Sequence, residues 1–309
     1  MKSLHKRRAL VMGLTLWAAA AARAEPVQVV ASFSILADLV QIVGGPAVTT
    51  TTLVKAGADP HVFEPRPADV RKLASARVVF VNGLGFEGWL NRLVRSSGAE
   101  ARLVVVSAGL IASESPAPGR AGARDLQLGN PDTAGDPHAW HSVANAAHYV
   151  RNIRTALCAA SPASCSGITA RADAYLAELD RLERSIRAAI RALPPGRRTV
   201  ITGHRAFSHF ATAYGIRFVS PRLGGAQTHA SPQIMAGLIK LIEAEQINAL
   251  FLEKVSDPRL VQQISRETGL EPSGTLYSDT LGPAGSGADS YVGMMRHNVE
   301  TLIFGLSRP

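Results

Sequence analysis

Three histidines and one aspartate carry the most specific chemistry in this sequence. His61, His204 and Asp279 each follow a short β-branched run of the kind that forms a strand, and His138 ends a long loop before a helical pattern. In open parallel sheets, ligands bind beyond the carboxyl ends of the strands. We therefore expect these four side chains to meet in one place.

Two of the histidines occur in the same tripeptide, which reads Asp-Pro-His at residues 59–61 and again at 136–138. Proline fixes its own φ and keeps the preceding residue extended, so each imidazole projects from a stiff segment. A single copy is best interpreted as a turn with an exposed histidine. The second copy, at another element junction, makes a ligand equally plausible.

His204 lies between a predicted strand and a predicted helix, directly after Gly203. Such a junction can also hold a phosphate at the start of a helix. Neither of the common glycine-rich phosphate motifs occurs around His204. This segment taken alone leaves both interpretations open.

Three neutral imidazoles and one carboxylate form a closed tetrahedral set suited to Zn²⁺. Nitrogen-rich ligation favours zinc, copper or nickel over manganese and calcium, which prefer oxygen. A closed set leaves no position for an activated water, whereas catalytic zinc sites keep one open. The ligand chemistry therefore predicts a protein that holds the metal and is not an enzyme.

The remaining sequence alternates strand and helix patterns, which predicts an α/β fold with mainly parallel sheets. Expected strands span residues 27–33, 50–54, 78–81, 103–106, 199–202, 217–219, 249–252 and 274–277. Expected helices span residues 35–43, 67–75, 86–96, 143–158, 168–193, 206–214, 232–245, 258–268 and 290–306. Residues 112–136, rich in Ser, Pro, Gly and Ala, are expected to form a surface loop.

The helix expected at 168–193 has one apolar stripe, formed by Leu176, Leu179, Leu182, Ile186, Ile190 and Leu193. About 25 residues at roughly 1.5 Å each span nearly 40 Å, enough to run along two lobes. We predict two doubly wound lobes, at residues 25–166 and 195–309, joined by one long rigid α-helix at 167–194.

Residues 1–24 have the features of a secretory signal peptide: a basic start, an apolar stretch and an Ala-x-Ala site at 22–24. No cysteine lies near that site, so we expect a periplasmic protein without a lipid anchor. Removal of this segment, with five basic residues and no acidic one, lowers the formal charge from +9 to +4. No basic stripe interleaved with aromatics remains, which argues against nucleic acid as a partner.

Cys158 and Cys165 are the only two cysteines in the chain. Their spacing excludes a CxxC pair, and an exported protein meets oxidising conditions. We therefore expect a local disulfide.

Several segments together resemble the zinc/manganese substrate-binding proteins of ABC importers, the cluster A-I type. They are Gly57–His61 with Phe63-Glu64-Pro65, Val81–Leu90, Asp136–Trp140, Gly203–Phe207, Tyr291–Asn298 and, more weakly, Arg266–Gly269. The resemblance extends over essentially the whole chain after the signal peptide. They are specific in combination and weak singly.

The resemblance implies metal binding in the cleft between two lobes, with His61 and His138 from the first and His204 and Asp279 from the second. A histidine at the His204 position goes with the zinc-specific branch. We therefore expect a monomeric zinc-binding protein that delivers Zn²⁺ to an ABC transporter permease, with a periplasmic zinc chaperone as a further candidate partner. The alternatives are a manganese-binding homologue, an exported zinc hydrolase and a surface adhesin.

The sequence also departs from the resembled family. Residues 112–136 contain no histidine, whereas many zinc members carry a histidine-rich loop there. His141 follows His138 by three residues and is an alternative ligand, and Glu253 and Asp289 are alternatives to Asp279. We expect surface or hydrogen-bonded roles for His148, His209, His229 and His297, with His229 the strongest exception.

Overall fold

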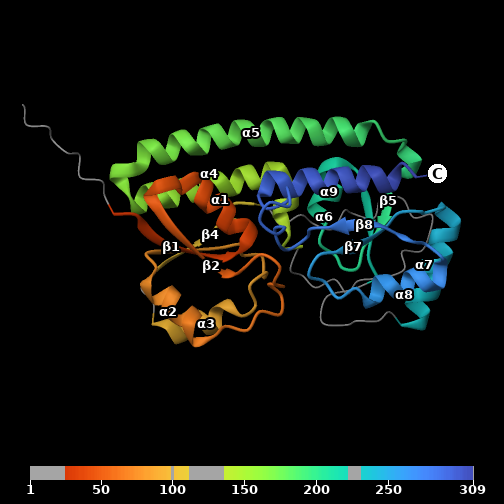
Figure 1. The fold of residues 1–309 in the computed structure, drawn as a ribbon, viewed down its shortest axis with the longest axis horizontal. Coiled ribbons are helices and arrows are strands. Elements are labelled where there is room, and N and C mark those ends of the chain that lie inside the picture. The colour runs from red at the N-terminus through yellow and green to blue at the C-terminus, as the bar shows by residue number, and fades with distance from the viewer. Residues whose placement is uncertain (1–24, 99–100, 111–135, 222–230, 309) are drawn as a thin grey trace, which may run out of the picture.

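The computed structural model describes residues 25–98, 101–110, 136–221 and 231–308. Two parallel four-stranded sheets form the centres of two lobes (Figure 1). The first has the order β2-β1-β3-β4, from β1 (Val27–Phe33), β2 (Val48–Val54), β3 (Val78–Val81) and β4 (Arg102–Val105). The second has the order β6-β5-β7-β8, from β5 (Thr199–Ile201), β6 (Arg217–Val219), β7 (Leu250–Glu253) and β8 (Pro272–Leu276). The predicted α/β fold with parallel sheets is confirmed.

Helices cover both faces of each sheet (Figure 1). In the first lobe they are α1 (Ser34–Gly44), α2 (Pro67–Ser75), α3 (Leu90–Ser97) and α4 (Val143–Ala160). In the second they are α6 (Ser208–Tyr214), α7 (Pro232–Glu245), α8 (Arg259–Thr268) and α9 (Tyr291–Leu306). In each sheet the chain leaves the first strand to one side and then crosses to the other, and such a switch creates a crevice at the carboxyl ends of the strands.

The long helix α5 (Cys165–Arg191) runs along both lobes (Figure 1). It packs against α1 and α4 of the first lobe and against α9 of the second. Its buried face follows the predicted stripe from Leu179 onward, but Tyr175 and Ala172 take the place expected for Leu176. This confirms the predicted connecting helix.

The larger hydrophobic core is continuous between the lobes. It contains Phe33 and Phe80 from the first lobe, Leu179 from α5, and Phe207 and Phe251 from the second lobe. A smaller separate core lies beneath α7 and α8. Buried apolar side chains of both lobes therefore belong to one connected cluster.

Cys158 and Cys165 form the predicted disulfide, which joins the last turn of α4 to the start of α5. Among the described residues, no helix is both long and apolar enough to cross a membrane. The predicted signal peptide, residues 112–135 of the predicted loop, and His229 lie outside the described residues.

Candidate metal centre

The fold brings His61, His138, His204 and Asp279 together at the carboxyl ends of the strands. One ligand atom from each lies within 4.8 Å of the others. Asp279 and His138 are buried, at 1% and 3% exposure, while the His61 side chain is 35% exposed. The cluster is therefore closed on one side and reachable from solvent on the His61 side.

The spacing of these atoms fits a small tetrahedral ion. His138 Nε2 lies 3.1 Å from His61 Nε2 and 3.0 Å from Asp279 Oδ1. Asp279 Oδ2 lies 3.3 Å from His204 Nε2. A tetrahedron with metal–ligand bonds of roughly 2.0–2.1 Å has edges of about 3.3 Å. These three separations are close to that edge length, and the four ligand atoms together lie within 4.8 Å of one another.

Two atoms of the cluster are buried without a hydrogen bond to any described residue, His204 Nε2 and Asp279 Oδ1. Unpaired buried polar atoms cost free energy, and native proteins rarely keep them. A divalent cation among these atoms would satisfy both. The donor set and its unpaired atoms therefore fit a bound metal.

A buried carboxylate fixes the ring of His138. Asp136 Oδ1 accepts from His138 Nδ1 at 2.6 Å and from the backbone N–H of His138 at 2.9 Å. Its second oxygen accepts from the backbone N–H of Ser208 in the second lobe, at 3.0 Å. Because the carboxylate accepts from Nδ1, the lone pair of Nε2 faces the centre of the cluster.

His204 has a similar partner. Glu253, at the end of β7, places Oε2 2.6 Å from His204 Nδ1, and its Oε1 accepts from the His204 backbone N–H at 2.8 Å. Val255, two residues later, has φ +68°, a left-handed conformation that is strained for a β-branched residue. The turn that carries Glu253 is thus held in an unfavourable conformation beside the cluster.

His61 is held mainly through its backbone. Its N–H donates to Asp59 Oδ1 at 2.8 Å, and the carbonyl of Pro60 accepts from Trp89 Nε1 at 2.9 Å. The imidazole contacts the edge of the Phe86 ring. The Asp-Pro-His segment therefore presents the ring from a fixed backbone, as its proline predicts.

Asp279 follows β8 and is positioned by side chains around it. Ser278 Oγ donates to Asp279 Oδ2 at 2.7 Å. Asn298 on α9 accepts from the Tyr277 N–H at 2.8 Å and donates to the Tyr277 carbonyl at 2.7 Å. One side chain thus binds both backbone groups of Tyr277, two residues before Asp279.

The charges of these groups are strongly coupled. Burial disfavours the imidazolium of His138, but Asp279 and Asp136 outweigh it and raise its pKa to about 9. Burial likewise opposes the charged form of His204, and Glu253 with Asp279 raises its pKa well above the ordinary value. Burial raises and the two imidazoles more strongly lower the pKa of Asp279, to well below its usual range. In the absence of a metal ion, His138 and His204 therefore favour the protonated form, and their positive charge lies where that of the metal ion would lie.

The three residues expected as alternative ligands, His141, Glu253 and Asp289, have other partners. His141 is fully buried and its Nε2 faces the carbonyl of Ser278 at 3.0 Å, outside the cluster. Glu253 contacts the outer nitrogen of His204, and Asp289 accepts from Gly285 N–H at 2.7 Å.

The described histidines outside the cluster are hydrogen-bonded to carbonyls. His148 contacts Ala108, His209 contacts Asp136 and His297 contacts Thr275. The sequence analysis did not name Asp136 and Asn298 as supporting residues, and Glu253, expected there as an alternative ligand, instead supports His204. Of these three residues, only Asp136 could have been recognised from the sequence, because it lies in the repeated Asp-Pro-His tripeptide.

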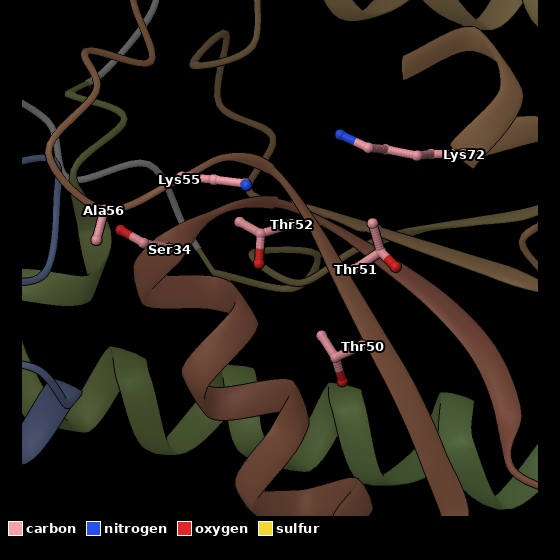
Figure 2. A pocket seen from close by; sticks show the side chains of 7 residues that line it. All are labelled: Ser34, Thr50, Thr51, Thr52, Lys55, Ala56 and Lys72. Atoms are coloured by element: carbon pink, nitrogen blue, oxygen red, sulfur yellow. The ribbon is translucent and has the colours of Figure 1, made fainter. Parts of the chain in front are cut away.

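A separate pocket of about 530 Å³ lies on the first lobe, and Figure 2 shows its lining side chains. They are Ser34, Thr50, Thr51, Thr52, Lys55, Ala56 and Lys72. This lining contains no histidine and no carboxylate. The pocket therefore lacks the ligands of a metal site.

The fold and the cluster are those of a two-lobed metal-binding protein. Residues 29–304 match the family described as ZnuA, zinc-uptake complex component A, periplasmic. The chain belongs to this family of metal-binding components of ABC transporters. The expectation that it is not an enzyme is confirmed by that membership.

Relatives differ in the metal that their names give. The chain is 33% identical over 284 residues to the manganese-binding lipoprotein MntA of Halalkalibacterium halodurans, covering 92% of this chain and 90% of the relative. It is 27% identical to the iron ABC transporter substrate-binding lipoprotein MtsA of Streptococcus pyogenes, covering 93% and 91%. The periplasmic zinc-binding protein TroA of Treponema pallidum has a similar structure, with TM-score 0.82 and 26% identity over 92% of this chain and all of TroA.

One expectation is corrected by these comparisons. The absence of a cysteine near the predicted cleavage site led to the prediction of a protein without a lipid anchor. Both MntA and MtsA are named lipoproteins, so that prediction is wrong by this comparison. A binding role outside the cytoplasm is supported.

Proposed function

We propose that the chain binds one zinc ion through His61, His138, His204 and Asp279 and delivers it to the permease of an ABC importer. The observation that carries this proposal is the closed set of three imidazoles and one carboxylate at tetrahedral spacing. Nitrogen-rich ligation favours zinc over manganese. The set supplies no open position for an activated water, which supports carriage of the ion as cargo.

The proposal includes the division into a signal peptide (1–24), a first lobe (25–166), a linking helix (167–194) and a second lobe (195–309). It also includes a monomer and, as a further partner, a periplasmic zinc chaperone. Support for two lobes acting together comes from the cluster itself, since His138 precedes α4 of the first lobe and His204 follows β5 of the second. Sedimentation of the zinc-loaded protein tests the monomer.

The alternative cargo is manganese, which the name of the relative MntA favours. Competition dialysis of the metal-free protein against zinc, manganese and iron(II) separates these cargoes. We expect one zinc per chain, bound more tightly than manganese. Tighter binding of manganese would overturn the zinc proposal and leave the metal-binding class intact.

The residues are tested by substitution. His204→Ala removes an inner ligand and is expected to abolish tight zinc binding, whereas His148→Ala, which changes a histidine hydrogen-bonded to Ala108, should bind like the unaltered protein. Full zinc affinity in His204→Ala would contradict the assignment of that residue. Zinc-dependent turnover of peptide, phosphoester or lactam substrates would favour a hydrolase instead.

A further inference from the structure

The loop that carries Asp279 leaves the second sheet but is bound to the first lobe. The carbonyl of Ser278 accepts two hydrogen bonds from that lobe, from Trp140 Nε1 at 3.0 Å and from His141 Nε2 at 3.0 Å. All four side chains in this group, including Asp279, are at most 1% exposed. The backbone directly before the carboxylate is therefore fixed by two donors in a dry environment.

The residues after Asp279 make further contacts with the first lobe. Thr280 Oγ1 accepts from the N–H of Gly57 at 2.8 Å, and the N–H of Leu281 donates to Ser34 Oγ at 3.1 Å. Gly57 belongs to the segment that leads to His61. The position of Asp279 is thus set by the first lobe on both sides of the residue.

The two residues that donate to the Ser278 carbonyl also connect His138 with Asp279. Trp140 and His141 belong to a 3-10 turn, Ala139–His141, that begins immediately after His138. Because His138 and the two donors share one short rigid segment, that segment sets the 3.0 Å separation between His138 Nε2 and Asp279 Oδ1.

We propose that His141 is a positioning residue for Asp279, which fixes this second-lobe carboxylate in the frame of the first lobe. The inference rests on the proposed function, in which Asp279 binds the metal. In this arrangement the first lobe helps to position three of the four ligands, His61, His138 and Asp279, while Asn298 on α9 also binds the backbone before Asp279. His204, with Glu253 behind it, is the ligand held by the second lobe.

Of the two donors, His141 is the one that can be tested without removing the core. The Trp140 ring packs against Phe33 and Phe86, so its loss would open a large cavity. The His141 ring lies against Phe207, with centroids 4.5 Å apart, and its Nδ1 is buried without a partner among the described residues. His141→Phe keeps an aromatic ring there and removes only the donor, and His141→Gln restores an N–H at about the same reach.

The experiment uses Co²⁺ as a spectroscopic substitute for zinc, together with the rate at which a chelator removes zinc from the loaded protein. In His141→Phe we expect changed visible absorption bands of bound Co²⁺ and zinc loss faster on the order of 10–100-fold, the usual effect of removing an outer contact on a ligand. His141→Gln should return both readouts towards those of the unaltered protein. His148→Phe, on the adjacent helix α4, is the matched control and should change neither.

A folded His141→Phe protein with unaltered spectrum and zinc release would overturn the inference. If instead the proposed function is wrong and Asp279 is not a ligand, Asp279→Ala will bind Co²⁺ with an unaltered spectrum, which distinguishes the two failures. If His141→Phe does not fold, nitrogen NMR of the unaltered protein decides. A proton on Nε2 of His141, with and without zinc, supports the inference, and a proton on Nδ1 overturns it.

Discussion

Asp136 Oδ1 lies 2.6 Å from His138 Nδ1, as close as Glu253 Oε2 lies to His204 Nδ1. Only Pro137 separates Asp136 from His138, so the carboxylate and the imidazole it orients come from one stiff tripeptide. The other ring nitrogen, Nε2, then lies 3.0 Å from Asp279 Oδ1. Two acceptor atoms at this distance need a proton or a metal ion between them.

The first prediction concerns this outer carboxylate. Asp136→Asn should weaken zinc binding on the order of 10–100-fold, because the amide no longer favours the tautomer that presents Nε2 to the metal. Glu253→Gln should act on His204 in the same direction. Competition with a fluorescent chelator measures both. Asp173→Asn, which alters an exposed carboxylate paired with Arg154, is the control, and equal affinities in all three variants would contradict the prediction.

The second prediction concerns pH and zinc affinity. The pKa of His138 in the metal-free protein is about 9, so at neutral pH zinc must displace a proton from the cluster. Apparent affinity should therefore rise with pH from 6.5 towards 9, and binding at pH 7 should release protons. Calorimetry in buffers with different ionisation enthalpies detects this release. Binding enthalpies independent of the buffer would exclude it.

The third prediction concerns pH and stability without metal. A pKa raised from 6.5 to about 9 means that His138 contributes stability fully below pH 6.5 and loses it as pH rises through 9. The melting temperature of the chelator-treated protein should therefore fall from pH 6.5 to 9 on account of this group. The stabilisation by added zinc should increase over the same range. A zinc-induced shift in melting temperature that shrinks with rising pH would be inconsistent with it.

The fourth prediction separates the disulfide from the metal cluster. Changing both Cys158 and Cys165 to Ser should lower the free energy of unfolding by about 2–3 kcal/mol, since the bridge closes only a short loop. Zinc affinity should stay within about twofold, because Cys158 lies near the far end of α4, roughly 22 Å along the helix from Val143 at about 1.5 Å per residue. Urea unfolding and chelator competition check the two parts separately. A large loss of affinity would show that the bridge also orders the cluster.

The fifth prediction concerns Asn298, whose side chain binds the backbone of Tyr277 shortly before Asp279. Asn298→Ala leaves the N–H and carbonyl of Tyr277 without their side-chain partner, and each unsatisfied buried group costs roughly 1–3 kcal/mol. We expect lower stability together with weaker zinc binding. Isothermal titration and thermal unfolding of the same preparation measure both, and a stability loss with unchanged affinity would limit Asn298 to a structural role.

The sequence predicted most of the elements because strand and helix patterns alternate clearly along the chain. The start of α3 was harder. The pattern predicts a helix from residue 86, but α3 begins at Leu90. Glu87 turns inward instead, accepting from Ser32 Oγ and from the N–H groups of Asn82 and Gly83. A buried carboxylate that binds the end of β3 has no signature in hydrophobic periodicity.

The four clustered residues could be predicted because each lies at an element junction, and the order of strands explains why their partners could not. Glu253 is the last residue of β7, and His204 follows β5, 49 positions earlier. The two meet because β5 and β7 are neighbours in the sheet, which alternation alone does not specify. Contacts that depend on strand order, unlike those within a tripeptide, need the folded structure.

The continuous larger core has a consequence for how the protein unfolds. Phe33 and Phe251 belong to different sheets, yet both lie in one cluster that α5 also joins. Because apolar side chains of both lobes pack in this one cluster, we expect the two lobes to melt in a single cooperative transition. The small core under α7 and α8 is the part able to loosen on its own, as a local opening below the global transition.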